Sequence, residues 1–175
     1  LGRAYDDDGR WAASGQVVEP LLAAMQQEPY FAQPPPKSTG RDLFHTDWLT
    51  QHLQPFAGAV LRTQDVQATL AELTAWVCAR DLRLHAPETG ELLVCGGGAR
   101  NAHLMRSFAQ RLPRVRVGTT DELGVPVDQV EGAAFAWLAH RFVARQPATS
   151  AGAPGPGGPG CPAPPSPPGK TKAAP

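Results

Sequence analysis

The segment LLVCGGGARNAHLM, residues 92–105, joins a short apolar run to three consecutive glycines and then to the start of a helical pattern. The apolar run is too short for a helix, and the glycines that end it favour a buried strand that leads into a tight turn. A helix is predicted to begin near Asn101 and to end before Pro113. The segment therefore predicts a strand, a glycine turn and a helix in direct succession.

The residues after this segment continue the alternation. Residues 115–120, VRVGTT, alternate and are rich in β-branched side chains, which predicts a second strand. A last helix is predicted over residues 129–143, with Trp137, Leu138 and Phe142 among the side chains expected to face the core. The order strand, helix, strand, helix predicts an α/β fold.

Helices also precede the glycine turn. The spacing of apolar residues predicts a helix within residues 17–28, with Pro20 in its first turn. Residues 29–44 contain three consecutive prolines and are predicted to be extended, and Thr46 is predicted to cap the short helix that follows. The most regular periodicity runs over residues 65–85 and predicts a core helix.

Composition limits the classes of partner and location. The chain has 16 Lys and Arg against 16 Asp and Glu, without the dense basic stripe that nucleic acid would require. No apolar run approaches the roughly 20 residues that span a bilayer, and no leader opens the chain, so a cytoplasmic protein is expected. Because residue 1 is Leu and not Met, we expect sequence upstream to be missing. Residues 146–175 are almost entirely Ala, Gly, Pro and Ser, which predicts a disordered tail after a folded domain of residues 1–145.

The glycine turn is the strongest candidate for chemistry. Gly96, Gly97 and Gly98 present backbone N–H groups at the start of a helix without a Cβ to block a ligand, which suits a phosphate or a nucleotide. Such a turn also serves simply to connect a strand to a helix. A third interpretation is a dinucleotide-binding fingerprint with Asp121 as its acidic residue, although Asn101 stands where the third glycine belongs.

Two other polar motifs are interpreted as structural. KSTGRDLF, residues 37–44, lacks the spacing of a phosphate loop, so we expect it to dock the extended segment. DDDG, residues 6–9, lacks the later ligands of a calcium loop and is predicted to be a hydrophilic turn. Asp121 and Glu122 follow the second strand and are open to two interpretations, hydrogen bonding to ligand hydroxyls or surface placement.

Three blocks of this sequence resemble the anhydro-N-acetylmuramic acid kinases in order and spacing: PPPKSTGRDLF at 34–44, LLVCGGGARN at 92–101 and TTDELGVPVDQVEGAAFAWLA at 119–139. The resemblance covers residues 2–143. It implies the C-terminal lobe of the two-lobed fold that is shared by actin, hexokinase and the heat-shock ATPases, a ribonuclease H-like α/β fold.

The resemblance also implies a function. The family uses ATP, with Mg²⁺, and water to open the ring of 1,6-anhydro-N-acetylmuramic acid and to form N-acetylmuramic acid 6-phosphate in peptidoglycan recycling. Gly96, Gly97 and Gly98 would then lie at the nucleotide, and Asn101 would cap the next helix or contact the nucleotide. Glu131 matches a family position that faces the sugar, although a carboxylate at a helix start is also favoured by the helix dipole alone.

The resemblance implies an incomplete catalytic site. The family's Gly-Thr-Ser-rich phosphate loop and its Asp-Thr-Gly-Pro-Gly-Asn block, which holds the general-base aspartate, do not occur in this sequence. No catalytic residue and no metal ligand are therefore assigned to the chain, and alone it is expected to be inactive. The implied partners are ATP, the anhydro amino sugar, a missing N-terminal lobe and a second copy in a homodimer. The alternative from another class is a non-catalytic nucleotide-binding remnant.

Overall fold

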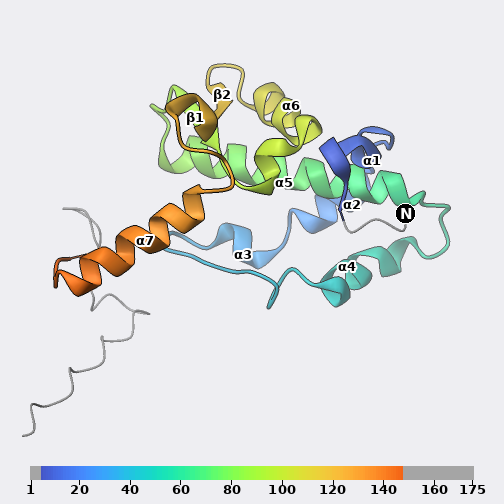
Figure 1. Ribbon diagram of the computed structural model, residues 1–175. Helices are drawn as coiled ribbons and strands as arrows, with labels where there is room; N and C mark the ends of the chain where they lie inside the picture. The colour runs from blue at the N-terminus through green and yellow to red at the C-terminus, as the bar shows by residue number, and fades with distance from the viewer. Residues whose placement is uncertain (1–4, 148–175) are drawn as a thin grey trace, which may run out of the picture. The chain divides into compact units, whose positions relative to one another are not determined.

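Helices account for most of the structure, a computed structural model that describes residues 5–147 (Figure 1). Two units are distinguished, Leu1–Glu131 and Gly132–Pro175. The elements are η1 (Asp7–Gly9), α1 (Arg10–Ala13), α2 (Glu19–Met25), α3 (Pro29–Ala32), α4 (Thr46–Leu53), η2 (Gln54–Phe56), α5 (Thr63–His85), β1 (Glu91–Val94), η3 (Gly97–Arg100), α6 (Ala102–Arg111), β2 (Arg116–Thr119), η4 (Thr120–Leu123) and α7 (Val130–Val143).

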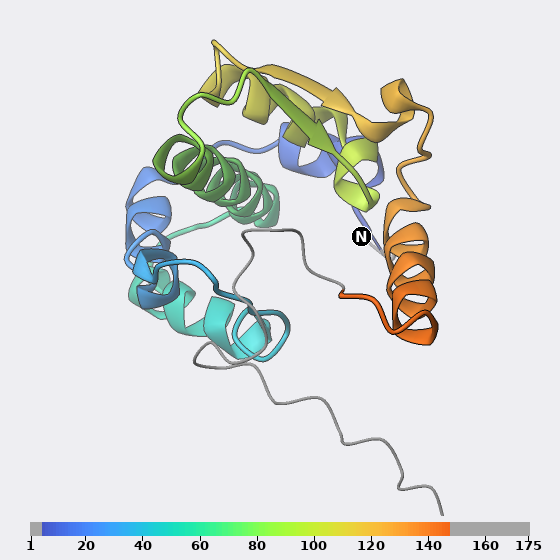
Figure 2. The same cartoon turned by 90° about the vertical axis from the view of Figure 1, so that its left-hand side faces the viewer.

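The long helix α5 is the centre of the first unit. The strands and α6 lie on one side of it, and α3 and α4 lie on the other (Figures 1 and 2). Small residues, Ala68, Ala75 and Ala79, are buried along α5 and permit close packing. On the α6 side, Arg111 donates through Nε to the carboxylate of Glu72 at 2.6 Å. The sequence prediction of a core helix here is confirmed.

The two strands form a parallel pair. Their register runs from Glu91 opposite Arg116 to Val94 opposite Thr119, and α6 makes the crossover between them. Parallel strands need such a crossover because a tight hairpin reverses the chain direction. The prediction of an α/β fold with a strand, turn, helix and strand in this order is confirmed.

A hydrophobic core lies beneath the opposite face of α5. It comprises the buried side chains of Leu21, Leu22, Met25, Phe31, Trp48 and Leu73. Three of these belong to α2, whose predicted apolar face is confirmed, as is Pro20 in its first turn. The chain before α2 is fixed to α5 by the fully buried Thr69, whose Oγ1 accepts from the N–H of Val18 at 2.9 Å and donates to the carbonyl of Asp65 at 2.7 Å.

The sequence predicts that residues 29–44 are extended, but the structure shows a short helix at the start of this range. A short helix, α3, occupies Pro29–Ala32 because proline suits the first turn of a helix and the Glu28 carboxylate accepts from the N–H of Tyr30 at 3.2 Å. The predicted cap of α4 is wrong by one residue. His45, and not Thr46, is the N-cap, and its Nδ1 accepts from the N–H of Asp47 at 3.2 Å.

Helix α7 lies almost entirely in the second unit. Helix α7 forms at the expected place, but its large apolar side chains are exposed, including Phe135, Trp137, Leu138 and Phe142. Helical periodicity predicts which side chains share a face, but not whether another surface covers that face. Among residues 5–147 no helix has the length and apolar character needed to cross a membrane. The predicted tail from residue 148 onward lies outside the described residues.

Candidate functional site

The glycine turn directly follows β1. Gly96 has φ +70°, a left-handed conformation that glycine adopts without strain, and its N–H donates to the carbonyl of Val127 at 2.7 Å. A Cβ built on Gly96 or on Gly97 meets no atom within 4 Å among the described residues. The turn is therefore open on the side where side chains would otherwise project.

Two N–H groups in the first turn of α6 already have acceptors within the chain. The side chain of Asn101 accepts from the N–H of Leu104 at 2.9 Å, and Asp8 accepts from the N–H of Ala102 at 3.0 Å. Asn101 is thus the N-cap of α6, one of the two roles that the resemblance implied. The N–H groups of Gly97 and Gly98 have no acceptor within residues 5–147. An anion at this turn would bind those two groups and not the end of α6.

Gly9 supports the same cap from the far end of the chain. It has φ +68°, and a Cβ built on it would lie 2.0 Å from Oδ1 of Asn101. The DDDG motif is consequently more than a hydrophilic turn, because Asp8 and Gly9 pack against the start of α6. Sequence reasoning missed this role, since no local pattern links residues that are 94 positions apart.

The segment before α7 is attached to the glycine turn. In addition to the Gly96 bond, Arg100 forms an ion pair of 2.9 Å with Asp128. Asp121 accepts from the N–H of Val127 at 3.0 Å and fixes the loop from the other side. Glu131, the predicted sugar-binding residue, follows within the first turn of α7 and is exposed.

Glu122 holds the loop after β2. Its carboxylate accepts from the N–H of Thr119 at 3.0 Å, as part of a capping box, and pairs with Arg116 at 2.5 Å. The bond from Arg116 and the Thr119 N–H hold the pKa of Glu122 below its ordinary value. Together with the bond that the Asp121 carboxylate accepts from the Val127 N–H, this favours the structural interpretation of both acids.

A buried hydroxyl lies at the same edge of the sheet. Thr120 follows β2 directly, and its Oγ1 is buried with no hydrogen-bond partner in the described part of the chain. Buried polar groups are almost always hydrogen-bonded, so this hydroxyl is available to a water molecule or a ligand. The carboxyl ends of both parallel strands, where α/β proteins bind ligands, therefore carry unused polar groups.

Metal ligands do not cluster within residues 5–147: no group of three or more His, Cys, Asp or Glu side chains there could hold an ion. Cys78 and Cys95 are free thiols. Burial, and secondarily the charge of Asp81, raises the pKa of Cys78.

Comparison with known proteins extends these observations. The sequence profile of the family described as anhydro-N-acetylmuramic acid kinase matches residues 1–159. Relatives with that name include proteins of Cupriavidus pinatubonensis, 58% identical over 158 residues, and of Cupriavidus metallidurans, 54% identical over 157 residues. A third, from Ralstonia nicotianae, is 51% identical over 161 residues. These alignments cover 89%, 88% and 87% of the chain, but only 42%, 41% and 41% of the respective relatives.

Proposed function

Because the chain belongs to the anhydro-N-acetylmuramic acid kinase family, we propose that it forms the C-terminal, nucleotide-binding lobe of such a kinase. The complete enzyme would use ATP to open 1,6-anhydro-N-acetylmuramic acid and to form N-acetylmuramic acid 6-phosphate in the cytoplasm. The lobe, residues 1–145, would have the actin- and hexokinase-like architecture of the family. Membership of a kinase family argues against the dinucleotide-binding oxidoreductase that the glycine pattern also allowed.

One observation supports the proposal most directly. The glycine turn has two N–H groups without acceptors in residues 5–147, and the chain that leads to Glu131 is hydrogen-bonded to it through Gly96 and Val127. A nucleotide-binding element and a sugar-binding residue must be held in fixed relation for phosphoryl transfer, which depends on positioning both reactants. The attachment of these two segments meets that requirement.

The residues at the turn fit a nucleotide. Side chains at Gly96 and Gly97 would project into open space, and the N–H groups of Gly97 and Gly98 would donate to phosphate oxygens. ATP supplies the phosphoryl group that is transferred. Asn101 acts indirectly by capping α6, and Glu131 would accept hydrogen bonds from sugar hydroxyls. Mg²⁺ would be held mainly by the nucleotide phosphates and water, as is usual for this ion.

The chain by itself is proposed to be inactive. It spans about 42% of the length of its Cupriavidus pinatubonensis relative. In the family, the general-base aspartate and the opposite phosphate loop lie in blocks that this sequence lacks, and loss of a general base alone slows a reaction by about 10²- to 10⁴-fold. Loss of the opposite wall of the cleft removes electrostatic stabilisation as well.

A fusion tests the proposal. The part of the Cupriavidus pinatubonensis relative that precedes the matched region is joined ahead of Leu1, and ATP-dependent phosphorylation of anhydro-N-acetylmuramic acid is measured. We expect turnover from the fusion and none above background from residues 1–175. Robust turnover by the unfused chain would contradict the proposal.

Glu131→Ala in the fusion tests the sugar-binding role. We expect a higher KM for the sugar and an unchanged KM for ATP. Glu19→Ala is the matched control, because Glu19 is an exposed glutamate in the first turn of another helix, α2. Equal KM values for the sugar in the two variants would contradict the sugar-binding role, and Glu131 would then only stabilise the start of α7 through the helix dipole.

The alternative function is a non-catalytic nucleotide-binding protein. A folded fusion that binds ATP without turnover would favour it, since the turn geometry is shared by both functions. The family resemblance also predicts a homodimer, which light scattering of the fusion would detect.

A further inference from the structure

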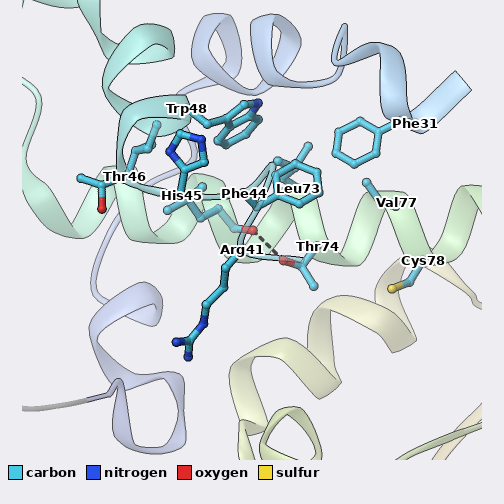
Figure 3. Close-up of a pocket in the computed structure, with 12 residues that line it drawn as sticks. Phe31, Arg41, Phe44, His45, Thr46, Trp48, Leu73, Thr74, Val77 and Cys78 are labelled. Carbon is cyan, nitrogen blue, oxygen red and sulfur yellow. Dashed lines mark hydrogen bonds between the residues drawn. The ribbon is translucent and has the colours of Figure 1, made fainter. Parts of the chain in front are cut away.

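A pocket of about 690 Å³ opens on the side of α5 that faces α3 and α4. Its walls are mainly aromatic and aliphatic, and include Phe31, Phe44, Trp48, Leu70, Leu73 and Val77 (Figure 3). This volume lies within the range of about 300–1,000 Å³ that is typical of small-molecule sites.

The pocket is separate from the glycine turn. Glu72 and Arg83 of α5 bond to Arg111 of α6, and the 11 positions between them amount to three helical turns, so they share a face. Leu70 and Val77, which line the pocket, lie on the other side of the same helix. Helix α5 therefore stands between the pocket and the element that carries the candidate nucleotide site.

The aromatic side chains that line the pocket, Phe31, Phe44 and Trp48, are held by ring contacts and by one hydrogen bond to a residue outside the lining. The ring of Phe44 stacks on Phe31 at 5.6 Å and meets Trp48 edge to face at 5.1 Å. The indole N–H of Trp48 donates to Glu28 at 2.8 Å, and Glu28 is not among the residues that line the pocket. The pocket is thus preformed and presents few polar groups of its own.

The extended segment that forms one wall is fixed by Lys37. Its ammonium group donates to the carbonyl of Phe31 at 3.1 Å and pairs with Asp81 at 3.0 Å. Arg80 donates to the same carbonyl at 2.7 Å. These bonds confirm that the KSTGRDLF motif docks the segment, but they leave Arg41 of that motif without a structural role.

Arg41 supplies the only full charge of the lining. No carboxylate of the described residues pairs with its guanidinium, and Asp and Glu are absent from the lining. Figure 3 shows its side chain extending away from the aromatic rings, so an apolar interior is combined with a cationic edge. We propose that this pocket binds a small apolar molecule with one anionic group, of the chemical class of a medium-chain carboxylate.

Decanoate is the test probe, used with the complete chain below its micelle concentration, with decanol and decyltrimethylammonium as its neutral and cationic analogues. Calorimetry should show saturable binding of one decanoate per chain, about threefold tighter than decanol because an exposed ion pair contributes little. Arg41→Gln should remove that preference. Equal binding of the three probes would overturn the anionic assignment.

Thr74→Phe places a ring in the pocket. The Thr74 hydroxyl bonds only to the Leu70 carbonyl one turn earlier, at 2.9 Å, so its loss should not unfold the chain. Thr50→Phe is the matched control, because exposed Thr50 makes the same bond to Thr46 at 2.9 Å and lies outside the lining. Thr74→Phe should weaken decanoate binding at least about tenfold. Absence of saturable binding to the unmodified chain, or equal binding by the two variants, would overturn the proposal.

Thiol labelling of the unmodified chain gives a second readout, and it does not depend on whether any variant folds. Cys78 lines the pocket and Cys95 does not, and both are free. Decanoate should slow alkylation of Cys78 at least about threefold while leaving Cys95 unchanged. MgATP should leave the alkylation of Cys78 unchanged. Protection of Cys78 by MgATP instead of decanoate would make the pocket part of the nucleotide site and overturn the inference.

Discussion

The backbone N–H of Gly96 donates a hydrogen bond of 2.7 Å to the carbonyl oxygen of Val127. This bond joins the turn after β1 to the chain that leads into α7. A left-handed glycine is required at position 96 because its φ is +70°, whereas Gly97 does not have positive φ. The two glycines therefore have different roles, one in the turn's conformation and the other in its accessible surface.

Removal of the cap from Asp8 should destabilise the chain. Asp8→Ala removes the acceptor for the Ala102 N–H and places alanine at φ 58°, so we expect a loss of about 1–2 kcal/mol in the free energy of unfolding. Urea denaturation measures it. Asp7→Ala is the control, since Asp7 is exposed and its carboxylate accepts no hydrogen bond among the described residues, whereas the bond that its backbone carbonyl accepts from the Arg10 N–H is kept in the variant. Equal stability of the two variants would contradict the role of Asp8.

The hydroxyl of buried Thr69 should contribute more to the free energy of unfolding than the hydroxyl of exposed Thr74. Thr69→Val keeps the shape but leaves the Val18 N–H without its acceptor, and a buried unsatisfied donor destabilises by about 1–3 kcal/mol. Thr74→Val removes an exposed hydroxyl that bonds only within its own helix and should have a much smaller effect. Chemical denaturation of both variants checks this difference. Similar losses in the two would show that Thr69 does not join α5 to the chain before α2.

The stability contribution of Asp65 should depend on pH. Its side chain pairs with Arg62 at 2.7 Å and accepts from the Gln16 N–H at 2.8 Å, and these bonds lower its pKa below the ordinary 3.8. A carboxylate with a lowered pKa in the folded state stabilises above its unfolded pKa, and the contribution is lost as pH falls through the folded value.

The measurement compares the unmodified chain with Asp65→Asn. The stability advantage of the unmodified chain should be largest near neutral pH and should shrink from about pH 5 downward. Urea midpoints across that range give the difference. A difference that stays constant to about pH 2 would show that ionised Asp65 contributes nothing specific.

The elements around the glycine turn could be predicted because their signals are local. An apolar run, three glycines and a helical period lie within a few residues of one another, a β-branched run follows at residues 115–120, and β1, α6 and β2 form where these patterns indicate. The nucleotide and sugar roles of Gly97 and Glu131 remain predictions. The family resemblance is the source of both proposed roles. The hydrogen bond that joins the glycine turn to the segment before α7 is compatible with both roles.

The long-range contacts could not be predicted in the same way. The carboxylate of Asp8 accepts a hydrogen bond from the Ala102 N–H because the tertiary fold brings the two residues together. No local sequence pattern predicts a contact between residues so far apart in the chain. The wall of the apolar pocket depends on Lys37 reaching Asp81, which is again a tertiary contact.

The measurement that tests the central proposal most directly is the KM for ATP of Gly97→Val in the active fusion. A Cβ at Gly97 meets no described atom within 4 Å, so the variant should fold while its side chain occupies nucleotide space. Gly58→Val is the matched control, since Gly58 is equally open and lies outside the turn. We predict that Gly97→Val raises the KM for ATP about tenfold or more while Gly58→Val leaves it unchanged. Equal KM values for ATP in the two folded variants would contradict the assignment of the glycine turn to the nucleotide.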